Sequence, residues 1–121
     1  MTQDIAYQIA NIAALAADDR KAVDIVILSV ADLTVLTDYF VIATGFSKNQ
    51  LRAIAKHIQE QVAEKCDRAP LRVSGEMEGT WIVQDFGEVI VHIMQPRERE
   101  FYALESFWGH APRLLLTKNA S

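Results

Sequence analysis

The pattern of apolar and polar positions predicts a chain in which helices and strands are interleaved. In residues 4–19 apolar side chains recur every three or four positions, the repeat of a helix with one buried face. Residues 24–30 and 39–44 are short, nearly continuous apolar runs, typical of strands covered on both faces. A Ser-x-x-Gln capping box that begins at Ser47 predicts a second helix, which should run to about Lys65.

The last third of the chain predicts a hairpin followed by a helix. A brief strand at 71–73 precedes two strands within 81–94, with the turn at Phe86-Gly87. A helix should open at Pro96 and continue to Trp108.

The expected order is therefore α-β-β-α-β-β-β-α, an α/β (α+β-like) domain in which helices pack on a mixed sheet. The strand-helix-strand passage from Tyr39 to Val73 is long enough for a right-handed parallel crossover. We expect the domain to occupy residues 1–110, with an unpatterned C-terminal tail at 111–121.

The expected last helix would have two distinct faces. Phe101, Leu104 and Trp108 fall on one face at the spacing of a core stripe. Tyr102 lies on the other face with two carboxylates, and a Tyr there suits either the core or an interface, as does Trp81 on the hairpin.

His92 occurs within an apolar strand, on the same face as Ile90 and Met94. It is either a core histidine hydrogen-bonded to a neighbour such as a carboxylate, or a polar group that faces a partner.

Composition favours a protein partner over a nucleic acid. The 121 residues include 12 Lys and Arg against 16 Asp and Glu, a net charge of -4, and the basic residues are scattered. Phosphate backbones repel such a chain, whereas a basic protein surface attracts it; the other explanation of the negative charge is solubility alone.

The single Cys66 fits a reducing cytoplasm, and we see neither a signal peptide nor an apolar run near the ~20 residues of a membrane span.

The catalytic and metal templates do not match this sequence. It has no Asp-x-Asp pair, no phosphate-binding glycine loop, and no two histidines at a metal-ligand spacing. The Gly45–Ser47 junction could bind an anion at a helix N-terminus, but a tight turn and a helix cap account for both residues. We therefore predict no catalytic residue, no cofactor and no metal, and expect that the protein is not an enzyme.

Several spaced motifs, in one order along most of the chain, resemble those of ribosomal silencing factor S (RsfS), the Iojap family. The matching segments are Thr37–Ile42, Thr44-Gly45 with Ser47, Ala53–Ala55, Gly75-Glu76, Trp81–Val83, Asp85–His92, and Arg99–Glu105 with Trp108.

The resemblance implies a fold related to the nucleotidyltransferases but without their catalytic carboxylates. It also implies binding to ribosomal protein L-fourteen on the large ribosomal subunit, a block on joining of the small subunit, and lower translation when nutrients are scarce. Homodimers are common in the family. We expect a cytoplasmic protein with no DNA or membrane partner and little or no direct RNA contact.

We expect the hairpin and last helix to supply the docking surface, because core packing alone does not require their mixture of polar and aromatic residues. The candidate partner-binding residues are Trp81, Asp85, His92, Glu98, Tyr102 and Glu105. Two other functions are considered: a nucleotide-binding, nucleotidyltransferase-like enzyme that uses the Gly45–Ser47 junction, and a dimeric scaffold without ribosome contact.

Overall fold

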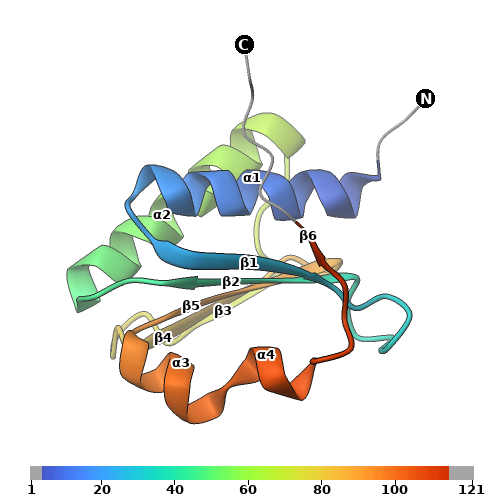
Figure 1. Ribbon diagram of the computed structural model, residues 1–121. Coiled ribbons are helices and arrows are strands. Elements are labelled where there is room, and N and C mark those ends of the chain that lie inside the picture. Colours follow the sequence, from blue (N-terminus) through green and yellow to red (C-terminus); the bar gives the residue numbers. More distant parts are fainter. Residues whose placement is uncertain (1–3, 115–121) are drawn as a thin grey trace.

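A six-stranded mixed sheet with helices on both faces makes up the fold of the computed structural model, which describes residues 4–114 (Figure 1). The strand order is β3-β4-β5-β2-β1-β6, and β2 with β5 is the parallel pair in an otherwise antiparallel sheet. The elements are α1 (Ile5–Asp19), β1 (Val23–Ser29), β2 (Tyr39–Thr44), α2 (Lys48–Cys66), β3 (Arg72–Ser74), β4 (Trp81–Asp85), β5 (Val89–Met94), α3 (Pro96–Tyr102), α4 (Leu104–Phe107) and β6 (Arg113–Leu114). The expected mixed α/β domain is confirmed.

Each of the two long helices begins directly after a capping residue, and the cap at Ser47 was predicted from the sequence. The Asp4 carboxylate accepts a hydrogen bond from the Ala6 N–H at 3.2 Å and caps α1. At α2, the Ser47 hydroxyl accepts from the Gln50 N–H at 3.0 Å, and the Gln50 side chain accepts in return from the Phe46 N–H at 2.7 Å. The capping box is therefore present, with its return bond one residue earlier than the standard pattern.

The predicted hairpin is confirmed as the antiparallel pair β4–β5. Its turn needs Gly87, which adopts φ +92°, and Asp85 stabilises the turn by accepting a hydrogen bond from the Gly87 N–H at 2.8 Å. The passage through α2 does return the chain parallel to β2, but β5 and β4 lie between β2 and β3, so the parallel neighbour of β2 is β5.

The sheet separates two apolar clusters. Its first face packs on α1 and α2, where alanines of α1 allow close approach to α2; this cluster includes Ile9, Ala13, Ile54, Ile58, Val91 and Ile93. Its second face packs on α4 and is smaller; this cluster includes Leu28, Phe40, Ile42 and Met94, with Leu104 and Trp108 packed against it.

Three details of the prediction are wrong. The start of β1 is exposed at Val23 and Asp24 rather than covered on both faces, because the β1–β2 register shifts there and Asp24 adopts φ +52°. The expected single helix is broken at Ala103, whose left-handed backbone (φ 46°, ψ 52°) ends α3 and opens α4. As a result Phe101 turns away from the core and is 78% exposed.

The third difference is β6. Arg113 and Leu114 pair with Leu28 and Ile27, so the first part of the expected tail extends the sheet. Residues 115–121 lie outside the described part of the chain.

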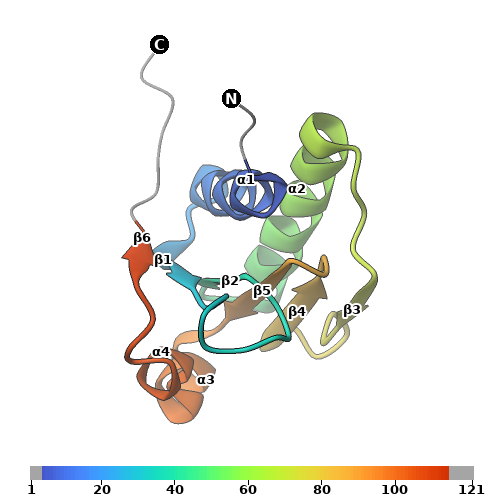
Figure 2. The same cartoon turned by 90° about the vertical axis from the view of Figure 1, so that its right-hand side faces the viewer.

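The helices cover the second face of the sheet incompletely. Figure 2 shows α1 and α2 together on one side of the sheet and the two short helices α3 and α4 on the other, where they leave part of the face around β3 without a helix. Among residues 4–114, none of the helices combines the length and the apolar content needed to cross a lipid bilayer.

Candidate docking site

Three aromatic side chains form a cluster where α3 meets the start of β4. The rings of Trp81 and Tyr102 lie 4.6 Å apart between centroids, and Phe101 meets Tyr102 edge-on at 4.9 Å. Tyr102 is 50% exposed and Phe101 78% exposed. Aromatic rings gathered at the surface are the usual anchors of protein interfaces, so this cluster is the strongest candidate for a docking site.

His92 supports the cluster from within the sheet. Its Nδ1 accepts a hydrogen bond from the Trp81 indole N–H at 3.1 Å, and its ring contacts Phe40 with centroids 5.4 Å apart. Burial lowers the pKa of His92 to about 4, so the ring is neutral at physiological pH and its Nδ1 is free to accept. This hydrogen bond agrees with the first of the two alternatives, a histidine bonded to a neighbour, although the neighbour is an indole rather than a carboxylate.

Arg99 ties the two short helices to the sheet. Its guanidinium donates to the Glu105 carboxylate through Nη2 at 2.6 Å and Nε at 3.1 Å, and to the Thr44 hydroxyl of β2 through Nη1 at 2.8 Å. Burial raises the pKa of Glu105, but the hydrogen bonds and charge of Arg99 outweigh it and the pKa is lowered. The side chains of Arg99 and Glu105 are only 12% and 22% exposed, so this pair fixes the path of the chain around Ala103.

Of the six expected partner-binding residues, the structure brings five to this end of the sheet. Trp81, Glu98 and Tyr102 line one pocket, while His92 and Glu105 contact the residues that hold it. Asp85 stands apart at the opposite end of β4, about 13 Å away from Trp81 at ~3.3 Å per residue. There its carboxylate serves the hairpin turn and lies 3.8 Å from the Arg72 guanidinium.

The α3 pocket is a shallow depression of about 350 Å³ beside the cluster, and it is lined by Thr80, Trp81, Arg97, Glu98, Phe101 and Tyr102. Sequence reasoning missed Phe101 as a surface residue because it assumed an unbroken helix. No Gly or Pro stands at the break, so the sequence held no signal for it.

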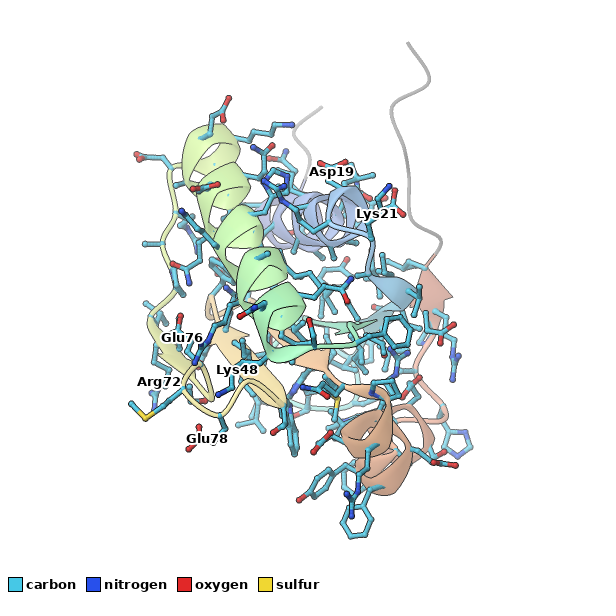
Figure 3. The ribbon with its side chains drawn as sticks, turned by 90° about the vertical axis from the view of Figure 1, so that its left-hand side faces the viewer. Asp19, Lys21, Lys48, Arg72, Glu76 and Glu78 are labelled. Atoms are coloured by element: carbon cyan, nitrogen blue, oxygen red, sulfur yellow. The ribbon has the colours of Figure 1, made fainter. Side chains whose placement is uncertain are left out.

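A second depression, of about 710 Å³, lies between α2 and the loop after β3. Figure 3 shows Lys48 at the start of α2 beside the loop that carries Glu76 and Glu78. The Arg52 guanidinium is already engaged there, because it donates at 2.8 Å to each of the Glu76 and Met77 carbonyl oxygens. Basic and acidic residues both line this depression, so its charge does not favour an anion.

The Gly45–Ser47 junction offers few free donors to an anion. The Gly45 N–H donates to the Met94 carbonyl at 3.1 Å, and the Phe46 and Gln50 N–H groups are taken by the helix cap. The turn-and-cap explanation of these residues agrees with that geometry. Within residues 4–114, no three His, Cys, Asp or Glu side chains are grouped so as to hold a metal ion.

Comparison with known proteins finds relatives along almost the whole chain. Residues 3–121 match the family model RsfS, described as "Ribosomal silencing factor during starvation". The ribosomal silencing factor RsfS of Bacillus subtilis is 39% identical over 104 residues, which are 86% of this chain and 87% of that protein. The mouse protein named "Mitochondrial assembly of ribosomal large subunit protein 1" is 35% identical over 91 residues, 74% of this chain and 40% of its own length.

A solved structure has the same fold. A crystal structure of a Chromobacterium violaceum protein superimposes with a TM-score of 0.83 at 31% identity, covering 98% of each chain.

Proposed function

The chain belongs to the ribosomal silencing factor (RsfS) family, and from that premise we propose that it binds ribosomal protein L-fourteen on the large ribosomal subunit and blocks joining of the small subunit. Translation would then fall under nutrient limitation. The observation that carries the proposal is the aromatic cluster in which Phe101 and Tyr102 of α3 meet Trp81 of β4, next to the Arg99–Glu105 pair that braces α3 and α4.

Charge supports a basic protein as the partner. The chain carries a net charge of -4, and ribosomal proteins are basic, so long-range attraction speeds encounter with one of them and disfavours bare RNA. The mouse relative is named for assembly of the ribosomal large subunit, which agrees with a partner on that subunit.

A steric blocker needs a rigid surface rather than a reaction. An interface of standard size buries about 1,200–2,000 Å² in total, and its core requires anchors that do not move. Here Trp81 is fixed by His92, and α3 is fixed by the Arg99–Glu105 pair. We therefore propose the α3 side of the sheet as the contact surface and the cytoplasm as the site of action.

We also propose that the free protein forms a homodimer. Apolar side chains on the loop between β1 and β2 are exposed, with Leu33 at 48%, Leu36 at 74% and Val35 at 101% exposure. A second copy would remove such a patch from water. Light scattering coupled to size-exclusion chromatography measures the dimer, and a single monomer mass at high protein concentration would contradict it.

The test of ribosome binding is co-sedimentation of the protein with purified large subunits. We expect Tyr102→Ala to lose most binding while remaining folded, and Phe107→Ala, which alters a 79% exposed ring on α4 outside the α3 pocket, to keep it. Addition of small subunits then shows whether the bound protein prevents formation of the complete ribosome. Absence of wild-type protein from the large-subunit fraction would overturn the proposal.

A further inference from the structure

The α3 pocket combines aromatic faces with the acidic residue Glu98, which forms no ion pair with any residue that the structure describes. We propose that this pocket receives a lysine or arginine side chain of the protein partner; the inference rests on the proposed function and names the chemistry of its central contact.

The walls of the pocket suit a cation. Trp81 and Tyr102 pack with their planes at 45°, and Phe101 stands nearly perpendicular to Tyr102 at 86°, so the rings do not form one flat stack. A cation within about 6 Å of an aromatic face is attracted by the electrons of the ring, most strongly for Trp. The indole N–H of Trp81 is already bonded to His92 and so does not present its positive edge to the pocket.

Glu98 supplies a negative charge beside these rings. Glu98 is one of the residues that line the pocket, and within residues 4–114 it enters no ion pair, unlike Glu88, which pairs with Arg68, and Glu105, which pairs with Arg99. Glu98 is half-buried as a residue, and a charge-assisted hydrogen bond from an incoming ammonium or guanidinium group would give its carboxylate the partner that it lacks within residues 4–114.

Arg97 is the opposing charge in the same pocket. It is exposed, so water screens its charge, and its long side chain has room to move aside. The position of Arg97 makes the charge of the occupant testable. Removal of Arg97 should strengthen the binding of a cation and weaken the binding of an anion.

The size of the pocket favours a single side chain over a cofactor. Its volume of about 350 Å³ lies near the lower limit of ~300 Å³ for ligand pockets, and it is open to solvent. One long basic side chain can contact both the aromatic and the acidic residues of the pocket, with its aliphatic stem against Phe101 and its charge near Glu98.

The experiment measures the dissociation constant of variants for purified large subunits. We expect Glu98→Gln, which keeps the shape and removes the charge, to weaken binding about 3- to 10-fold. Phe101→Leu, which keeps an apolar group but removes the ring, should weaken it by a similar factor, while Phe101→Trp should retain it. Arg97→Ala should tighten binding about 2- to 5-fold.

Matched controls lie on the same two short helices. Glu100→Gln removes a carboxylate of α3 that lines a different depression, and Phe107→Leu removes an exposed ring of α4. Both should bind like the wild type.

The pattern of results separates the possible occupants. An apolar occupant would tolerate Phe101→Leu and ignore or favour Glu98→Gln, and an anionic occupant would be weakened by Arg97→Ala; either result overturns the inference and leaves the proposed function standing.

A probe without ribosomes tests the pocket even if the proposed function fails. Chemical shifts of the free protein are titrated with N-acetyl-arginine amide and with N-acetyl-citrulline amide, which has a neutral side chain of similar shape. Larger shifts of the Trp81 indole and Phe101 ring with the arginine probe support the inference, and equal or absent shifts refute it.

Discussion

The two faces of the sheet differ in how completely they are covered. On the first face α1 and α2 bury a continuous apolar layer, and side chains such as Ile9, Ile54 and Ile93 are fully removed from water. On the second face the two short helices cover only part of the sheet and leave Phe101 and Tyr102 exposed. The first face therefore supplies stability and the second presents a surface, and variants on the two faces should fail in different assays.

The largest effect is expected from a cavity in the first face. Ile58 is fully buried between α2 and the sheet, so Ile58→Ala should lower the free energy of unfolding by about 2–5 kcal/mol, measured by urea denaturation. Met77→Ala, at a position that is 80% exposed and outside the proposed dimer patch, should change it by less than about 0.5 kcal/mol. A loss below about 1 kcal/mol at Ile58 would show that the first face is less tightly packed than described.

Acid should destabilise the second face through His92. Its folded-state pKa of about 4 lies below the ordinary value of 6.5, so the unfolded chain binds more protons between these values. Stability should be complete above pH 6.5 and fall by up to about 3 kcal/mol as the pH drops to 4. Urea denaturation across this pH range measures the decrease in the free energy of unfolding, and the decrease should be smaller in the His92→Gln variant. An equally large decrease in the variant would show that groups other than His92 cause it.

Loss of Arg99 should weaken the brace of the second face. Arg99→Ala leaves the Glu105 carboxylate and the Thr44 hydroxyl without their donor, at a cost of about 1–3 kcal/mol at neutral pH. Because the pKa of Glu105 is lowered in the folded protein, the contribution of the pair is present above the unfolded pKa and disappears as the pH falls through the folded one.

The difference in stability between Arg99→Ala and the wild type should therefore shrink in acid. The Arg113→Ala variant serves as a control, because Arg113 is an exposed arginine that makes only a charge contribution to Glu105. A difference independent of pH would mean that packing, not charge, holds the brace.

The smallest effect is expected where α3 meets α4. Ala103 adopts φ 46°, which L-residues other than Gly rarely do, so Ala103→Gly should raise stability by about 0.5 kcal/mol, seen as a small rise in Tm. The same change at Ala63, exposed within α2, should lower stability by about 1 kcal/mol. Equal effects at both positions would argue against strain at Ala103.

The fold could be predicted from the sequence where periodicity and caps agree. The predicted bounds of α1, α2 and the hairpin agree with the structure within two residues, because their apolar repeats are long and because the Ser47 capping box and the turn at Gly87 mark boundaries of α2 and the hairpin. The break at Ala103 and the two-residue β6 could not be predicted, because no turn residue marks the first and two residues carry no repeat for the second. Both depend on tertiary contacts, the Arg99–Glu105 pair and the edge of β1.

The candidate site could be predicted only in part. Trp81, Glu98 and Tyr102 do converge on one pocket, since the strand and the helix that carry them are adjacent in the chain. Asp85 does not, because an extended strand carries its far end away from the helix, and the hairpin turn uses its carboxylate. An unbroken helical repeat across Ala103 predicts that Phe101 lies in the core. The apolar repeat gives no sign of the break at Ala103, and in the structure Phe101 is exposed.

Both edges of the sheet discourage growth of the sheet from one molecule into another. β3 is three residues long and carries the exposed Arg72, while β6, as far as the described residues extend, pairs with Ile27 and Leu28 of β1. β1 is irregular where its register with β2 shifts, and irregular or very short edge strands are poor templates for strand addition. Two copies of this protein should therefore associate through side-chain surfaces, and the chain should resist aggregation at the high local concentrations of a translating cell.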